Sequence, residues 1–204
     1  ERGTITEATP PVRRGSIYAL SKLAAEGVVK RASAEGFPAV IVNPGHIIGR
    51  YDTHNWARMI EMTVRRKVPG IPPGSGSFCH AAAVADAMIA AAELGRAGQN
   101  YLCGGADATF VEVFHTIGRL TGAKVPKRAT PAAVLRLYAR ILAGVAMITG
   151  REPLVTPDAV AIVTAHARID SGLAIRGLGY QPVSLAAMLE DSYRWMKDEG
   201  LLAA

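Results

Sequence analysis

The chain has 204 residues, of which half are apolar, a fifth are charged and only six per cent are aromatic. This is the composition of an ordinary soluble globular protein, and the length suits one large domain or two small ones. The formal net charge is +6, but basic clusters such as Arg13-Arg14 and Arg65-Arg66-Lys67 are too dispersed for a nucleic-acid surface, so we expect no nucleic-acid partner.

The first predicted element is a helix from Ile17 to Glu35 that carries a tyrosine and a lysine four residues apart. Tyr18 and Lys22 then share one face of the helix, about 6 Å apart along its axis. An ammonium beside a phenol favours the phenolate form, so such a tyrosine can exchange a proton near neutral pH. The interconversion of a carbonyl and an alcohol requires this chemistry. The same spacing also arises by chance, so the pair alone does not establish a site.

A short apolar strand is predicted at residues 39–43, directly after this helix, because the run Ala39-Val40-Ile41-Val42 is apolar without a break. Pro44 and Gly45 end the strand. Ligands of open α/β sheets bind beyond the carboxyl ends of the strands, so residues 44–49 form the predicted site loop. Proline lacks an amide donor and glycine permits a close backbone approach. The alternative is a plain exit from strand to loop.

The rest of the chain alternates between predicted helices and short strands, which favours an α/β fold. The strand candidates are residues 77–80 and 100–103, and the helices are predicted at 54–67, 81–94, 109–120, 131–150, from 157, 170–177 and 185–199. We expect the strands at 39–43 and 100–103 to be parallel and covered by helices 17–35 and 81–94. Gly74-Ser75-Gly76 lies in a Pro/Gly-rich segment and is interpreted as a turn, because no convincing strand precedes it.

The cysteines and histidines give no sign of a metal site. Cys79 and Cys103 lie in apolar strand-like runs, which predicts buried, reduced thiols and a cytoplasmic location. The histidines lack metal-ligand spacing, and His115 and His166 are predicted on helix surfaces. The most apolar segment, residues 132–148, is interrupted by two arginines, so we expect neither a membrane span nor a membrane partner.

Five sequence blocks occur in one order along the chain, and together they resemble the extended short-chain dehydrogenase/reductase family. Within that family the nearest members are bacterial proteins called dihydroflavonol-4-reductase-like, or NAD-dependent epimerase/dehydratase. The blocks are Tyr18-x-x-x-Lys22, Asn43-Pro44-Gly45-His46-Ile47-Ile48-Gly49, His80-Ala81-Ala82-Ala83-Val84-Ala85-Asp86-Ala87, Gly98-Gln99-Asn100-Tyr101-Leu102-Cys103-Gly104-Gly105 and Gly177-Leu178-Gly179-Tyr180-Gln181-Pro182.

The resemblance implies the C-terminal part of a Rossmann-like, doubly wound parallel sheet, together with a mostly helical substrate-binding region. Residues 1–50 would end the dinucleotide-binding domain. Residues 51–204 would mainly bind substrate, with 78–105 returning to the Rossmann sheet. The family's glycine-rich dinucleotide loop, and the serine or threonine that assists its tyrosine, would lie before Glu1. We expect a longer source protein to supply them; otherwise this chain alone is an inactive fragment.

The resemblance also implies roles for individual residues. Tyr18 would donate or accept the proton, while Lys22 would favour its phenolate form and hydrogen-bond the nicotinamide ribose of NAD or NADP. The residues lining the nicotinamide would be Pro44, Gly45, His46 and Ile47. The residues meeting the substrate would be His54, Asn55, Phe78 and His80.

Three classes of function remain open from the sequence. The first is an NAD(P)-dependent oxidoreductase acting on a ketone or alcohol, and the second is an epimerase or dehydratase that uses the cofactor transiently. The third is a dinucleotide-binding protein without catalysis. Net cofactor turnover separates the first class from the second. The resemblance further implies a homodimer that associates through helices of the 17–35 region.

Overall fold

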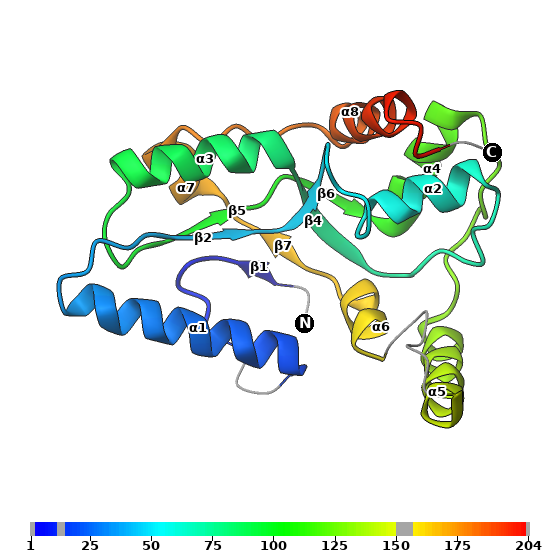
Figure 1. Ribbon diagram of the computed structural model, residues 1–204, viewed down its shortest axis with the longest axis horizontal. Helices are drawn as coiled ribbons and strands as arrows, with labels where there is room; N and C mark the ends of the chain where they lie inside the picture. The colour runs from blue at the N-terminus through cyan, green and yellow to red at the C-terminus, as the bar shows by residue number, and fades with distance from the viewer. Residues whose placement is uncertain (1–2, 12–14, 150–156, 203–204) are drawn as a thin grey trace.

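The computed structural model describes residues 3–11, 15–149 and 157–202 (Figure 1). Arg13-Arg14, and the helix boundaries predicted at Gly150 and Thr156, lie outside these residues. The helices are α1 (Ile17–Ala34), α2 (Ala57–Val64), α3 (Ala81–Leu94), α4 (Phe110–Thr121), α5 (Ala132–Thr149), α6 (Pro157–Thr164), α7 (Gly172–Leu178) and α8 (Leu185–Asp198). The strands are β1 (Thr4–Ile5), β2 (Ile41–Pro44), β3 (His46–Ile48), β4 (Ser75–His80), β5 (Asn100–Cys103), β6 (Ala106–Thr109) and β7 (Arg168–Ile169).

A parallel pair of strands lies between two long helices. β2 pairs with β5 in a register that runs from Ile41 opposite Asn100 to Pro44 opposite Cys103. Figure 1 shows α1 on one side of this pair and α3 on the other. β5 is mostly buried, whereas the residues of β2 stay partly exposed, so the apolar runs of the two strands are covered to different degrees. The predicted parallel pairing between the two helices is confirmed.

Local sequence signals fix where the principal helices begin and end. Ser16 caps α1 by accepting a hydrogen bond from the backbone N–H of Ala19, at 3.2 Å. Thr109 and Glu112 form a reciprocal capping box at the start of α4, the helix predicted from residue 109. Gly122 ends α4 in the left-handed conformation that glycine adopts without steric cost. The helix predicted at 54–67 is shorter, because Arg66 has a positive φ of 54° just beyond α2.

A second sheet carries the order β3-β4-β6, with β3 parallel and β6 antiparallel to β4. It corrects two interpretations: the predicted loop at 44–49 contains β3, and the predicted turn at 74–76 overlaps the start of β4 at Ser75. Glycines permit both strands to form where the sequence predicts a loop or a turn. A Cβ on Gly45 would lie 2.3 Å from the carbonyl oxygen of Ser77, and one on Gly74 would lie 2.3 Å from that of Val163.

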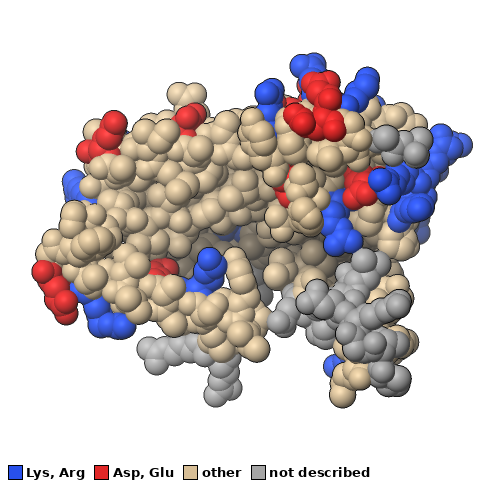
Figure 2. Space-filling model, viewed as in Figure 1, with Lys and Arg blue, Asp and Glu red and all other residues tan. Residues whose placement is uncertain are grey.

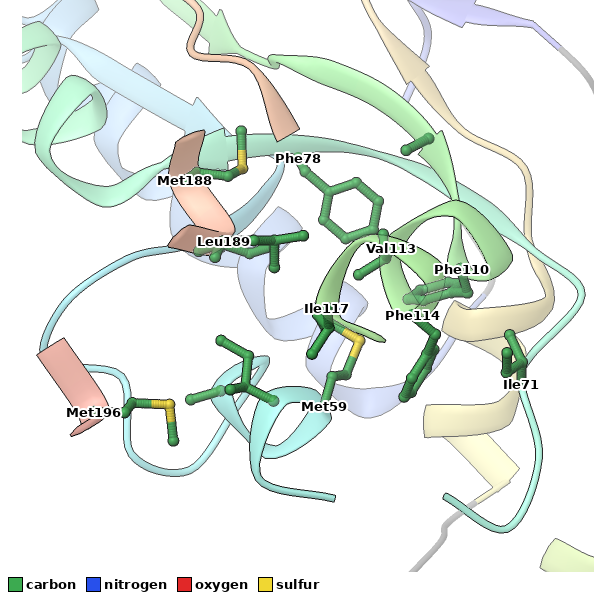
Figure 3. Close-up of a cluster of buried hydrophobic side chains, with 14 residues drawn as sticks. Met59, Ile71, Phe78, Phe110, Val113, Phe114, Ile117, Met188, Leu189 and Met196 are labelled. Atoms are coloured by element: carbon green, nitrogen blue, oxygen red, sulfur yellow. The ribbon is translucent and has the colours of Figure 1, made fainter. Parts of the chain in front are cut away.

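Two hydrophobic cores flank the sheets. One joins β3, β4 and β6 to α2, α4 and α8, and Figure 3 shows Phe78 directed into it among side chains of α4 and α8. The other joins α3, α7 and β5 around Cys79, Cys103 and Tyr180. The loop between β2 and β3 lies where the two cores meet, because its neighbours Ile48 and Cys103 belong to different cores.

The α5–α6 pair lies at one end of the molecule (Figure 1), where Val163 of α6 packs against the first core. α5 packs mainly against α6, and the chain then returns to β7, which pairs in parallel with β1. Among the described residues, no helix is both long enough and apolar enough to cross a membrane.

Candidate active site

Tyr18 and Lys22 lie in the first two turns of α1, on the same face as predicted. The Nζ atom of Lys22 is 5.7 Å from the centre of the Tyr18 ring, within the range of a cation–π contact. Both side chains are exposed, and Tyr18 retains 66% of its accessible surface. The phenol and the ammonium are therefore adjacent to each other and accessible to a ligand.

A polar clamp of three residues fixes α1 to the parallel strands. The side-chain amide of Asn100 on β5 donates to Glu26 Oε1 at 3.0 Å and to Asn43 Oδ1 at 2.8 Å. Glu26 lies one helical turn after Lys22, so the clamp sets the position of Lys22 relative to the end of β2. Burial raises the pKa of Glu26, but hydrogen bonds from Lys30 and Asn100 outweigh it and the net pKa is lowered.

Sequence reasoning missed this clamp, although it left a signal. A carboxylate four residues after Lys22, and an asparagine in each of two apolar strands, are polar groups that need partners when half-buried. Only the pairing of β2 with β5 shows that these residues meet.

Pro44, Gly45 and Ile47 lie together at the carboxyl end of β2. Pro44 is exposed, and Ile47 retains 37% of its surface. The backbone N–H of Gly45 donates to the carbonyl of Cys103 at 3.0 Å, and the absence of a Cβ lets this backbone approach β4. The predicted cofactor-lining segment therefore presents an exposed proline and an isoleucine around a tightly packed glycine.

His46 packs into a cluster of aromatic rings. Its ring centre lies 4.6 Å from that of Trp56 and 5.1 Å from that of Phe78. Gly76 leaves room for it, since a Cβ there would lie 2.3 Å from the His46 ring. Burial lowers the pKa of His46, so the imidazole is neutral at pH 7. The predicted substrate residue Phe78 is itself fully buried and supports His46 within this cluster.

His80 joins a charged group that reaches the C-terminal helix. Its Nε2 lies 3.1 Å from Asp191 Oδ2 on α8, and Arg50 Nε donates to Asp191 Oδ1 at 2.8 Å. Burial raises the pKa of Asp191, but the bonds from Arg50 and His80 outweigh it and the net pKa is lowered. Sequence reasoning missed Asp191, which lies 111 positions from His80 and carries no local motif.

His54 and Asn55 are exposed just before α2. The carboxylate of Asp52 accepts hydrogen bonds from the backbone N–H groups of His54, Asn55 and Ala57, so it holds this turn in place. This acceptor role is that of a helix N-cap, and the aspartate before the predicted helix was its signal in the sequence. These bonds involve only the backbone of His54 and Asn55; the His54 ring itself makes a side-chain hydrogen bond with Thr53, with Nδ1 2.5 Å from Oγ1.

The remaining histidines differ from their predicted placement. His166 lies beyond α6 rather than on a helix surface, and its Nδ1 is 2.9 Å from Ser75 Oγ. His115 lies on α4 but is half-buried, with Nε2 3.1 Å from the carbonyl oxygen of Pro126. No group of three or more His, Cys, Asp or Glu in the described part of the chain could hold a metal ion.

The two cysteines are free and buried, as predicted. Burial raises the pKa of Cys79 to about 12 and that of Cys103 to about 11, so both stay protonated and neither acts as a nucleophile. Two cavities lie away from the predicted site. One, of about 310 Å³, is lined by residues of α5 and α6, and the other, of about 390 Å³, lies between β2 and α3.

Parallel strands between helices, with polar and glycine-rich segments at their carboxyl ends, define the chain as a Rossmann-like α/β protein. Residues 1–104 match the model of the NAD dependent epimerase/dehydratase family, and the chain belongs to this family. The predicted family and fold are thereby confirmed. The family's description names NAD, which agrees with the predicted cofactor class.

Two curated relatives are each 25% identical to the chain. Sterol demethylase protein B of Methylococcus capsulatus aligns over 94% of this chain and 60% of its own length. A putative dihydroflavonol 4-reductase of Synechocystis aligns over 90% of this chain and 55% of its own length. The chain thus spans somewhat over half the length of the relatives that it matches.

Solved structures share the fold. The crystal structure of gox2253 is 27% identical and superposes with a TM-score of 0.79, over 97% of this chain and 62% of that one. DesIV, a dTDP-glucose 4,6-dehydratase of Streptomyces venezuelae solved with NAD and TYD bound, is 21% identical, with a TM-score of 0.70 over 100% of this chain and 57% of that one. The latter likeness concerns the fold alone.

Proposed function

We propose that the protein is an NAD(P)-dependent oxidoreductase of the short-chain dehydrogenase/reductase type, acting on a ketone or alcohol. The observation that carries the proposal is the exposed Tyr18–Lys22 pair on α1, the helix that the Glu26–Asn100–Asn43 clamp joins to β2 and β5. In this proposal the Tyr18 hydroxyl donates a proton to a substrate carbonyl oxygen, or accepts one from an alcohol, and the ammonium of Lys22 stabilises the phenolate.

The residues at the end of β2 fit a nicotinamide cofactor. The Lys22 ammonium offers donors to ribose hydroxyls, and exposed Pro44 and Ile47 offer apolar contacts to a flat ring beside the packed backbone of Gly45. The bound cofactor would supply the hydride exchange. His46, neutral and held by its aromatic neighbours, would keep water from one side of this region.

We further propose that substrate is met by His54 and Asn55, whose side chains are exposed beside α2. Phe78 would act indirectly by supporting the His46 ring, and His80 by fixing α8 through Asp191. The division into an end of the dinucleotide-binding domain at 1–50 and a mainly substrate-binding region at 51–204 is part of the same proposal, with 78–105 in the Rossmann sheet. The free, buried thiols suit a reducing compartment such as the cytoplasm.

The family description favours a second candidate, a sugar epimerase or dehydratase. The same tyrosine would then move a proton while the cofactor is restored within each catalytic cycle. Absorbance at the reduced nicotinamide band distinguishes the two: an oxidoreductase changes it in proportion to product, whereas an epimerase or dehydratase does not. Tight cofactor binding without any turnover would instead indicate a dinucleotide-binding protein that does not catalyse.

The experiment that tests the proposal is replacement of the Tyr18 hydroxyl. Tyr18→Phe keeps the ring and its contact with Lys22, so we expect the fold and the cofactor affinity to persist. Loss of a positioned proton donor should lower turnover about 10²–10⁴-fold, which corresponds to ~3–5 kcal/mol of barrier. The measurements are steady-state rates across pH and a fluorescence titration of the cofactor. Both compare the variant with the unmodified protein, in a form of the protein whose activity has first been demonstrated.

Tyr193→Phe is the matched control, because it removes a hydroxyl from a half-buried tyrosine of α8, at the opposite end of the chain. Its rate should stay within a few-fold of the parent's. Lys22→Met should both weaken the cofactor and shift the remaining activity to higher pH. A Tyr18→Phe enzyme as fast as the control would show that the pair is a coincidence of helical spacing.

A further inference from the structure

The excess of positive over negative charge arises in one stretch of the chain. Residues 113–149 contain six Lys and Arg and no Asp or Glu, whereas the rest of the chain contains seventeen of each sign. The net charge of +6 therefore belongs to α4, the connector after it, and α5. The six residues are Arg119, Lys124, Lys127, Arg128, Arg136 and Arg140.

Figure 2 shows Lys and Arg side chains gathered at the end of the molecule where α2 and α4 lie, on the same side as α5 in Figure 1. Although Glu61 pairs with Arg65 at the end of α2, the excess of cations at this end gives the protein an electric dipole that orients it toward an anionic surface.

α5 exposes an apolar stripe within this basic stretch. Val134, Leu137 and Ile141 retain 54%, 61% and 55% of their surfaces, and Tyr138 retains 46%. Their spacing of three, four and seven residues places them on one face of the helix. Another face packs against α6, where Ala139 is fully buried. The stripe is therefore additional to the face that holds α5 in the fold.

Exposed stripes of this length are costly in water and mark a surface that another body covers. A second copy of this chain is a poor candidate, because it would bring the same excess of cations against the first. A nucleic acid would satisfy the charge but not the aliphatic side chains. A bilayer surface containing anionic lipids satisfies both, since acyl chains accept the stripe and headgroups attract the cations.

We propose that α5 docks the protein onto an anionic membrane surface, with the stripe Val134–Leu137–Tyr138–Ile141 inserted at the boundary between headgroups and acyl chains. The helix would lie in the plane of the surface, in keeping with the absence of a spanning helix among the described residues. Arg136 and Arg140 lie on a different face, where they line the cavity beside α6. A helix is about 10–12 Å across, near the Debye length, so these charges still attract the surface.

The proposal departs from the expectation of no membrane partner, which rested only on the lack of a spanning segment. It is also independent of the proposed chemistry, because it uses no residue of the candidate active site. Docking would also affect which substrates reach the candidate active site, because a protein held at a bilayer surface has access to substrates dissolved in the lipid.

The test is flotation of the purified protein with vesicles of phosphatidylcholine alone or mixed with phosphatidylglycerol, at low and high salt. We expect the parent to float with the anionic vesicles, and the bound fraction to fall as salt rises. Leu137→Asp and, separately, Ile141→Asp should weaken this binding at least about tenfold, because each puts a carboxylate in the inserted stripe. Circular dichroism confirms that each variant is folded, as expected for positions more than half exposed.

Ile175→Asp is the matched control: it also replaces an exposed aliphatic residue on a helix, α7, by a carboxylate. It should float like the parent. Lys127→Gln together with Arg128→Gln should reduce the salt-dependent part of binding while leaving the stripe intact. The proposal is overturned if the parent stays with the unbound fraction at low salt, or if Leu137→Asp floats as well as Ile175→Asp. It is also overturned if α5 proves to join two copies, seen as a dimer mass that Leu137→Asp reduces without any vesicle binding.

Discussion

The burial of His46 couples the protonation of one side chain to the stability of the candidate site. The imidazole packs between Trp56 and Phe78 with Gly76 against its edge, so these neighbours displace much of the water that would hydrate a charged ring. Its pKa is lowered by this burial. The unfolded chain has no such restriction, and there the ring titrates near its ordinary value of about 6.5.

The sign of the resulting pH dependence follows from these two states. Above pH ~6.5 the ring is neutral in both, and the native state carries no penalty. As the pH falls below ~6.5, His46 becomes protonated in the unfolded chain but stays neutral in the native state, so unfolding is favoured. We predict a loss of up to about 1.4 kcal/mol of unfolding free energy per pH unit, until the lowered native pKa is reached.

Urea denaturation between pH 5 and about 8 measures this loss, with His46→Phe as the comparison. The variant keeps a ring in the aromatic cluster but cannot titrate, so the difference between parent and variant isolates His46 from the other histidines. That difference should be constant above pH ~6.5 and should change steadily below it. A difference that stays flat through pH 5 would mean that His46 titrates as it does in the unfolded chain.

Within the fold, the β2–β3 segment depends on a glycine that no other residue can replace at low cost. Gly45 leaves β2 and lets the next strand, β3, pair with β4. The space for a side chain there is filled by the backbone carbonyl of Ser77, 2.3 Å from where a Cβ would lie. The nearest obstructing atom is a backbone atom of β4 and cannot swing away as a side chain can, so the strands themselves would have to separate.

We predict that Gly45→Ala lowers the unfolding free energy by about 2–4 kcal/mol, because overpacking against backbone is poorly relieved. Gly144→Ala is the control: Gly144 lies inside α5 with nothing within 4 Å of the added methyl. That change should instead stabilise the protein by about 0.5–1 kcal/mol, through helix propensity and reduced freedom of the unfolded chain. Chemical denaturation of the two variants should give opposite signs, and equal effects would contradict the packing argument.

The molecule as a whole presents α1 as a largely uncovered element. No residue of this helix is buried, and Ile17 and Val28 retain 86% and 57% of their surfaces. The Glu26–Asn100 bond attaches one face of the helix to the strands, which leaves the other faces for further contacts. An exposed apolar surface on a helix of this length favours association.

We predict a homodimer that forms through α1, observed as twice the monomer mass in sedimentation velocity at micromolar concentration. Val28→Glu should shift the equilibrium toward the monomer, because it places a carboxylate in the buried contact. Leu94→Glu, at the exposed end of α3, should leave the dimer unchanged. A parent that sediments as a monomer, or a dimer that Leu94→Glu disrupts equally, would exclude this interface.

The sequence by itself determined the elements whose signals are local. The helix at Ile17, the capping box at Thr109 and the apolar strands β2 and β5 follow from caps and from unbroken apolar runs, and all three are found in the structure. The shared face of Tyr18 and Lys22 also follows from helical spacing alone. Five short blocks in a fixed order further indicated the family that the family model confirms.

Only the tertiary structure decided which distant groups meet. Glycines at 45 and 74 read as loop or turn in the sequence, yet they permit strand pairing because neighbouring backbone fills the place of their side chains. The clamp from Glu26 to Asn100 and the bond from His80 to Asp191 join residues 74 and 111 positions apart. Such partners are set by how helices and strands pack in three dimensions, and no local pattern records that packing.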